Sequence, residues 1–129
     1  MPVELNHTIV SARDPLASAR FAAEILGLED PGRFGPFVIL QTANGVSLDY
    51  LEESGPIASQ HYAFLVTESE FDKISERIAQ RDVVFWALPG RNHPGEINRR
   101  DGGRGLYFED PDGHMLEILT RPYGSGNPA

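Results

Sequence analysis

The chain has 129 residues, enough for one domain with a substantial apolar core. Hydrophobic residues make up 40% of it and the formal net charge is −8. An acidic surface repels phosphate backbones and anionic lipids, so nucleic acids and membranes are poor candidate partners. The absence of cysteine excludes disulfides and thiolate metal sites, and any bound metal would need nitrogen and oxygen ligands.

The N-terminal residues show no targeting pattern. Met1 to Glu4 lead directly into a strand-like stretch, without a basic segment followed by an apolar one. No apolar run approaches the roughly 20 residues needed to span a bilayer. We therefore expect a cytoplasmic protein.

The first half of the chain predicts a strand, a helix and two further strands. Residues 5–10 are apolar and β-prone. Asp14 and Pro15 suit the N-cap and first position of a helix, and Gly27 suits its end. Apolar residues recur between them at helical spacing. Strands are then expected at residues 36–41 and 46–51, joined by a turn at Asn44-Gly45.

The second half repeats this order. Residues 60–66 are strand-like, and Thr67 with Glu70 forms a capping box that begins a helix. The spacing of Phe71, Ile74 and Ile78 predicts the buried face of that helix. Further strands are expected at residues 83–86, 96–99, 105–109 and 114–120.

The two halves align at functional positions. A histidine begins the first strand of each half, His7 and His61. Gly45 is followed four residues later by Asp49, as Gly113 is by Glu117. We therefore predict an α+β fold of two tandem βαβββ modules forming a curved mixed sheet. The modules would span residues 1–54 and 57–122 of one structural domain, and residues 123–129 would form a flexible tail.

These positions predict a metal site. Alternation along the last strand places Glu117 on one face with apolar neighbours, where a carboxylate is costly unless a positive charge lies close. His7, His61 and Glu117 together would offer nitrogen and oxygen ligands to Zn²⁺, Ni²⁺, Mn²⁺, Fe²⁺ or Co²⁺. Asp49 would be a fourth ligand or a base. In the alternative interpretation the histidines are structural, Glu117 pairs with an arginine such as Arg121, and Asp49 faces solvent.

The segment 89–104 is a second place for function. It is rich in arginine, glycine and proline, and loops on a rigid scaffold often contact substrate. We expect substrate contacts from Arg99 and Arg104 together with Trp86 and Tyr107. The alternative is that the arginines keep a hairpin soluble and the aromatic residues pack in the core. Of the two spare histidines, His114 is expected on the surface of a turn.

Two stretches of sequence resemble the vicinal oxygen chelate superfamily, which includes glyoxalase I, fosfomycin-resistance thiol transferases, extradiol dioxygenases and bleomycin-binding proteins. They are residues 107–117, YFEDPDGHMLE, and residues 60–64, QHYAF. The resemblance implies a paired βαβββ fold, often dimeric. It also implies metal ligands at His7, His61 and Glu117, with a fourth ligand position where Asp49 stands.

The resemblance implies a metal-dependent enzyme of the glyoxalase type, a lyase or isomerase. It would act as a homodimer on a small oxygen-rich metabolite chelated to a divalent metal, with Glu117 and Asp49 as catalytic carboxylates. The alternative is a metal-free protein that binds a drug or natural product, as in bleomycin resistance. A fosfomycin thiol transferase is less favoured because no lysine follows Lys73. An extradiol dioxygenase is less favoured because the chain lacks a convincing additional catalytic histidine.

Overall fold

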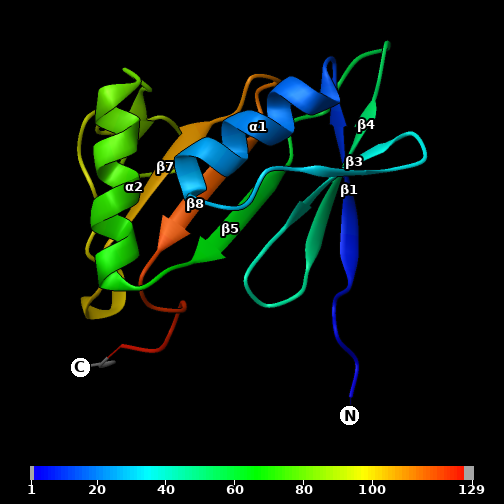
Figure 1. Ribbon diagram of the computed structural model, residues 1–129. Coiled ribbons are helices and arrows are strands. Elements are labelled where there is room, and N and C mark those ends of the chain that lie inside the picture. The colour runs from blue at the N-terminus through cyan, green and yellow to red at the C-terminus, as the bar shows by residue number, and fades with distance from the viewer. Residues whose placement is uncertain (1, 127–129) are drawn as a thin grey trace. The chain divides into compact units, whose positions relative to one another are not determined.

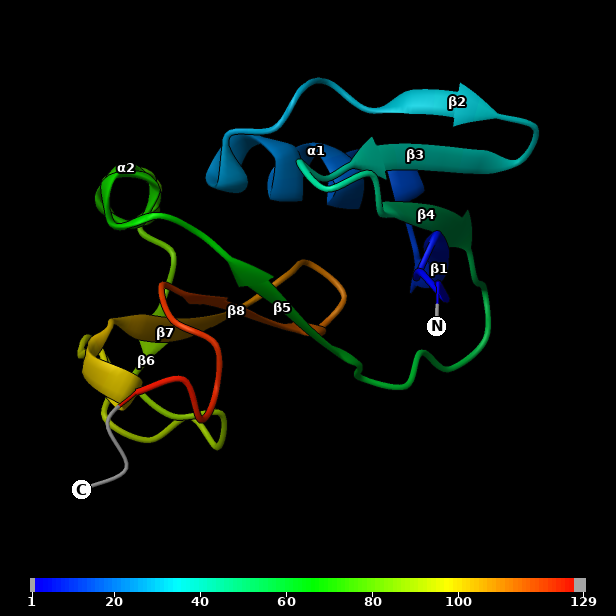
Figure 2. The same ribbon diagram turned by 90° about the horizontal axis from the view of Figure 1, so that it is seen from below.

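The computed structural model describes residues 2–126, which divide into two compact units, one up to Ala58 and one from Ser59 onward (Figures 1 and 2). Each unit contains one helix and one four-stranded sheet. In the part of the chain described, no helix is both long and apolar enough to cross a membrane.

The first unit contains β1 (His7–Ala12), α1 (Pro15–Leu26), β2 (Gly32–Phe34), β3 (Phe37–Gln41) and β4 (Ser47–Glu52). Its sheet has the order β1-β4-β3-β2. The pair β1 and β4 is parallel, and the other neighbours are antiparallel.

The second unit contains β5 (His61–Leu65), α2 (Glu68–Gln80), β6 (Phe85–Trp86), β7 (Gly105–Glu109) and β8 (Met115–Leu119), with a short 3₁₀ turn at Arg100–Gly102. The sheet order β5-β8-β7-β6 repeats that of the first unit, again with one parallel pair, β5 and β8. The predicted α+β fold of two βαβββ modules is confirmed.

Local capping explains where the helices begin and end. The Asp14 side chain accepts a hydrogen bond from the Ala17 amide at 3.1 Å, and Gly27 ends α1 with φ of 73°. The Thr67 hydroxyl accepts from the Glu70 amide at 3.1 Å and begins α2. Both predicted helix starts are confirmed.

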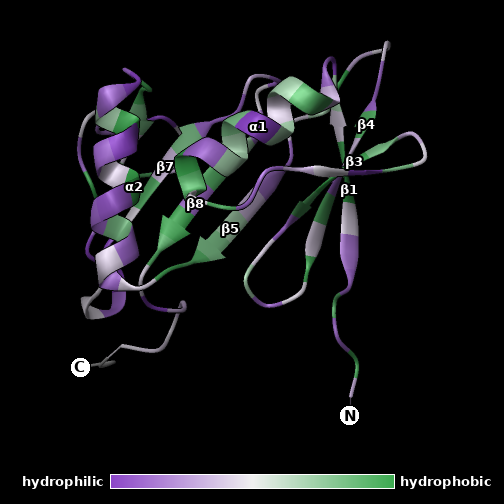
Figure 3. Cartoon of the chain, in the orientation of Figure 1, coloured by the Kyte–Doolittle hydropathy of each residue, from purple (hydrophilic) through white to green (hydrophobic). Residues whose placement is uncertain are grey.

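The two helices bury different kinds of side chain. α1 buries a row of alanines, Ala19, Ala22 and Ala23, which lets the helix approach its sheet closely. α2 instead buries Phe71, Ile74 and one further isoleucine, Ile78, and its other faces are largely hydrophilic (Figure 3). Successive side chains of each strand point to opposite faces of its sheet; in β3 Val38 and Leu40 are buried in alternation with less buried neighbours, whereas four of the five residues of β7 are buried.

Two expectations about the strands were wrong. β2 was not expected, because three exposed residues carry no periodic pattern. Conversely, residues 96–99 form no strand; Asn98 makes a single bridge with Gly105, and Pro94, which precedes the segment, makes one with Trp86. The chain turns on both sides of this segment, since Arg91, His93 and Gly95 before it and Asp101 after it have positive φ, which leaves little room for a regular strand.

Candidate metal centre

Strand register places a histidine and an acid at equivalent points of both units. In the first unit His7 is paired with Ser47 and Ile9 with Asp49. In the second, His61 is paired with Met115 and Ala63 with Glu117. In each unit the histidine and the acid are therefore diagonal neighbours on the face of the sheet that points away from the helix of that unit.

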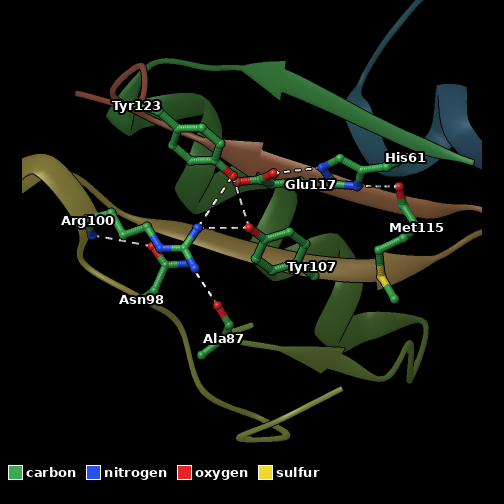
Figure 4. A network of polar contacts seen from close by, with 8 residues as sticks. All are labelled: His61, Ala87, Asn98, Arg100, Tyr107, Met115, Glu117 and Tyr123. Carbon is green, nitrogen blue, oxygen red and sulfur yellow. Dashed lines mark hydrogen bonds and ion pairs between the residues drawn. The ribbon is translucent and has the colours of Figure 1, made fainter. Parts of the chain in front are cut away.

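In the second unit these two side chains meet. The His61 Nε2 atom lies 3.0 Å from the Glu117 Oε1 atom, and His61 Nδ1 lies 3.1 Å from the Met115 carbonyl oxygen (Figure 4). Glu117 is only 1% exposed, whereas the His61 side chain is 47% exposed. The pair therefore joins a buried carboxylate to an imidazole that solvent can reach.

The hydrogen-bond geometry requires a cation or an additional proton between the two residues. A carbonyl oxygen can only accept, so His61 Nδ1 donates to Met115. In the neutral ring Nε2 is then an acceptor, and it faces an acceptor oxygen of Glu117 at 3.0 Å. A metal ion satisfies both, and the backbone bond at Nδ1 is the outer contact that metal-binding histidines usually make.

The other oxygen of Glu117 is held by a tyrosine. The Tyr123 hydroxyl donates to Glu117 Oε2 at 2.5 Å and lies 3.0 Å from the Tyr107 hydroxyl. The Arg100 Nη1 atom donates to the Tyr107 hydroxyl at 3.0 Å and to that of Tyr123 at 3.4 Å. Figure 4 shows Glu117 between Tyr123 and His61, with Arg100 on the far side of the tyrosines.

The electrostatics of this network follow from burial and charge. Burial of the Tyr123 hydroxyl, together with its bonds to Glu117 and Tyr107, raises the pKa of Tyr123 well above its usual value. Burial tends to lower the pKa of Arg100, but its bond to Tyr107 and the nearby tyrosines and Glu117 outweigh this and raise it. Tyr123 therefore remains a hydrogen-bond donor and Arg100 a cation.

Tyr123 was not among the predicted site residues. It was expected in a flexible tail of residues 123–129, but its hydroxyl contacts Glu117, and Gly124 and Gly126 donate to the Asp101 carboxylate. Residues 127–129 of that tail lie outside the described residues. Arg100 was likewise missed, although its neighbour Arg99 was predicted.

The turn before β8 fixes the start of β5. The Gln60 amide donates to His114 Nδ1 at 3.0 Å, immediately before His61. His114 is fully buried, so the expectation that it lies on a turn surface was wrong. Its own amide donates to the Asp110 carboxylate at 2.8 Å, and burial raises the pKa of Asp110. The turn thus holds the strand that carries His61 against the strand that carries Glu117.

The first unit offers a looser pair. His7 is exposed, and its Nδ1 lies 2.7 Å from the Asn6 side-chain oxygen. Asp49 is half-buried and accepts from the Ser47 hydroxyl at 2.8 Å. Among residues 2–126, no three His, Asp or Glu side chains gather into a group able to hold a metal. His61 and Glu117 are therefore brought together, and the convergence of His7 and Asp49 with them stays a prediction.

The predicted substrate-binding residues separate into two places. Tyr107 and Trp86 are register partners on the face that carries Glu117, and the Arg91 guanidinium lies 5.8 Å from the Trp86 ring. Arg104 lies elsewhere, since it bonds Glu68 and Asp72 of α2 at 2.7 and 2.9 Å.

Arg99 is exposed at the start of the 3₁₀ turn. The adjacent Arg100, rather than Arg99 or Arg104, reaches the Glu117 network.

Comparison with known proteins identifies the family. The model of the Glyoxalase/Bleomycin resistance protein/Dioxygenase superfamily matches residues 4–118. The chain belongs to this superfamily.

The chain is also similar to individual members. The solved structure of "Oxidase ChaP-H2" is 61% identical with a TM-score of 0.95, covering 98% of this chain and 100% of its own. "Oxidase ChaP-H1" is 64% identical with a TM-score of 0.93, covering 95% and 98%. A "Glutathione transferase FosA" from Serratia marcescens is 32% identical over 88% of this chain and 78% of its own length. Members named for oxidation and for thiol transfer are thus both similar to it.

Proposed function

We propose that this protein is a metal-dependent oxidase that acts on a small oxygen-rich molecule. The observation that carries the proposal is the His61–Glu117 contact, in which Nε2 and a carboxylate oxygen lie 3.0 Å apart and a metal ion would be bound by both. The choice of an oxidase is supported by the names of the two solved structures that are more than 60% identical over nearly the whole chain. An oxidase passes electrons from its substrate to dioxygen, which is therefore the proposed co-substrate.

The proposed metal ligands are His61, Glu117 and His7, with Asp49 as a fourth ligand or a base. The set contains two imidazoles and one or two carboxylates, which suits a first-row divalent ion, Zn²⁺, Ni²⁺, Mn²⁺, Fe²⁺ or Co²⁺. Such an ion would act as a Lewis acid and would hold two neighbouring oxygens of the substrate.

The surrounding residues orient these ligands. The Met115 carbonyl fixes the ring of His61, so that Nε2 is the atom left for binding. Tyr107 and Trp86 form part of the face beside Glu117 and would contact the substrate. Burial of Glu117 excludes water from its carboxylate, and the Tyr123 hydroxyl donates a hydrogen bond to its Oε2 atom.

A second candidate is the lyase or isomerase expected from the sequence. It is favoured by the contact between Glu117 and the Tyr123 hydroxyl, because a buried carboxylate that a hydrogen bond holds in place is suited to act as a general base. This chemistry moves protons within the substrate and consumes no dioxygen. Glutathione transfer, the activity in the name of the Serratia relative, is less favoured because the chain has no lysine after Lys73.

Oxygen consumption separates these candidates. The purified protein would be stripped of metal, reloaded with Fe²⁺, Mn²⁺, Co²⁺, Ni²⁺ or Zn²⁺, and incubated with small hydroxy-carbonyl and polyphenol compounds in air and under argon. We expect turnover that needs the metal, consumes dioxygen and is lost in His61→Ala. Equal turnover under argon would replace the oxidase with the lyase or isomerase. Tight binding of a natural product that survives in His61→Ala without turnover would instead favour the metal-free binding protein.

We also propose that the protein acts as a homodimer in which His7 of one copy joins His61 and Glu117 of the other. Mixing His7→Ala with His61→Ala tests this arrangement. Subunit exchange would create one intact site per mixed dimer, so a purified mixed dimer would regain about half of the wild-type metal binding and a randomly exchanged mixture about a quarter. No restoration in a confirmed mixed dimer would mean that each chain supplies all its own ligands. The cytoplasmic location remains a prediction.

A further inference from the structure

Residues 122–126 form a strap that follows β8. The Ser125 amide donates to the Pro122 carbonyl at 3.1 Å, and Gly124 has φ of 78°, a conformation that glycine adopts readily in such a turn. At Gly126 an added Cβ would lie 2.4 Å from the Asp101 Cα, so only glycine fits. The strap is therefore shaped to lie against the 3₁₀ turn at Arg100–Gly102.

Asp101 holds the strap in place. Its two carboxylate oxygens accept from the Gly124 and Gly126 amides, each at 3.1 Å. Asp101 itself has φ of 55°, which aspartate tolerates better than most residues. The adjacent Arg100 lies 5.6 Å from the Tyr123 ring and donates to its hydroxyl. Two successive residues of one turn thus fix the tyrosine that reaches Glu117.

Tyr123 is 58% exposed, yet its hydroxyl enters the buried network. Core packing does not account for this side chain, because more than half of the residue remains exposed. Its most direct effect is on Glu117, where the hydroxyl occupies Oε2 and leaves Oε1 facing His61. The two oxygens of one carboxylate are therefore given different partners.

We propose that Tyr123 is a positioning residue that makes Glu117 bind the metal through one oxygen only. This inference rests on the proposed metal site. With Oε2 held by a hydroxyl, the carboxylate offers Oε1 alone, and one more coordination position stays open for substrate. Without the hydroxyl, the carboxylate can turn and offer both oxygens to the ion. Arg100 and Asp101 act through Tyr123 by holding it in place.

Titration of the metal-free protein with Co²⁺ tests the proposal. Tyr123→Phe removes a single oxygen atom and keeps the ring. We expect Co²⁺ affinity to fall about 10-fold, as is usual when an outer partner of a ligand is lost. We also expect the visible absorption of bound Co²⁺ to change, because an added carboxylate oxygen raises the coordination number. The spectrum is the decisive measurement, since a loss of stability alone would not alter it.

Tyr62→Phe is the matched control. Tyr62 lies in β5 of the same unit, and its ring contacts His114 at a centroid distance of 6.0 Å rather than Glu117. Its loss of a hydroxyl should leave both the affinity and the spectrum unchanged. Asp101→Asn supplies a second variant, which tolerates the same backbone conformation but weakens the hold on the strap. It should shift affinity and spectrum in the same direction as Tyr123→Phe, by a smaller amount.

The outcomes separate the two proposals. If the wild-type protein binds no Co²⁺, the metal site and the role of Tyr123 both fall. If it binds Co²⁺ while Tyr123→Phe and Asp101→Asn keep its affinity and its spectrum, the metal site stands and the positioning role is overturned. Circular dichroism of each variant shows whether it is folded. If Tyr123→Phe does not fold, the result for Asp101→Asn decides the test.

Discussion

The two units share one topology and one strand register but differ in what surrounds the histidine and the acid. In the second unit Glu117 is buried and contacts His61 and Tyr123. In the first, Asp49 is half-buried and bonds Ser47, a neighbour on its own strand. Strand register thus places a histidine and an acid at equivalent positions in each unit. The segments around the sheet determine which further residues contact them.

The main added segment lies between the second and third strands of each unit. Residues 35–36 join β2 to β3, whereas residues 87–104 join β6 to β7. The longer connection carries Arg100 and Asp101, which contact Tyr123 and the strap. Asn98 stabilises this connection by donating to the Ala87 carbonyl at 2.8 Å. A duplicated fold can therefore gain a specialised site in one copy by lengthening a single loop.

Replacing the acid of each unit should give the largest difference between the units, measured as the loss of metal affinity. Glu117→Gln removes the charge of a proposed ligand, and we expect metal affinity to fall on the order of 1,000-fold, more than the 10- to 100-fold typical of an outer partner. Asp49→Asn should lower it about 10-fold or less, because Asp49 is only half-buried and is bonded to Ser47. Isothermal titration with Zn²⁺ and Mn²⁺ measures both. Equal losses in the two variants would show that the units contribute alike.

Core substitutions in the two helices should differ in kind. Ile78→Ala removes a fully buried side chain from α2 and should lower the free energy of unfolding by about 3 kcal/mol through the cavity it leaves. Ala22→Leu adds volume where α1 lies close to its sheet and should cost about 1–3 kcal/mol through overpacking. Urea denaturation provides the values. If Ala22→Leu proved neutral, close packing of α1 would be refuted.

The buried turn of the second unit predicts a small pH effect. Burial raises the pKa of Asp110 above that of the unfolded chain. The folded state therefore favours the protonated acid, and this contribution to stability is lost as pH rises through the raised pKa. Asp110→Asn keeps an acceptor for the His114 amide without the buried charge. Its Tm relative to the wild type should increase from pH 3.5 to pH 7, and a constant difference would exclude a titrating Asp110.

Much of the fold could be predicted from the sequence because its determinants are local. Asp14, Gly27 and Thr67 mark helix ends by their own chemistry, and the repeat of a histidine and an acid indicated the equivalent positions. Tyr123 could not be predicted in the same way. A single tyrosine among glycine, serine and proline carries no periodic pattern, and its position depends on Asp101, 22 residues earlier.

The burial of His114 likewise could not be predicted from local sequence. Its turn was identified from the sequence, but its burial depends on the bond from the Gln60 amide on a strand far away in the chain. Arg104, predicted at the substrate, instead pairs with Glu68 and Asp72, because the start of β7 lies beside α2. Contacts between segments that are distant in the chain determine both the burial of His114 and the position of Arg104.

Metal stoichiometry tests the central claim most directly. The protein would be stripped with a chelator, titrated with Zn²⁺ or Mn²⁺, and analysed by native mass spectrometry, with His7→Ala and His61→Ala measured in parallel. We predict one tightly bound ion per chain in the wild type, with binding strongly weakened in both variants. A wild-type protein that takes up no ion, or one whose uptake is the same after His61→Ala, would contradict the account.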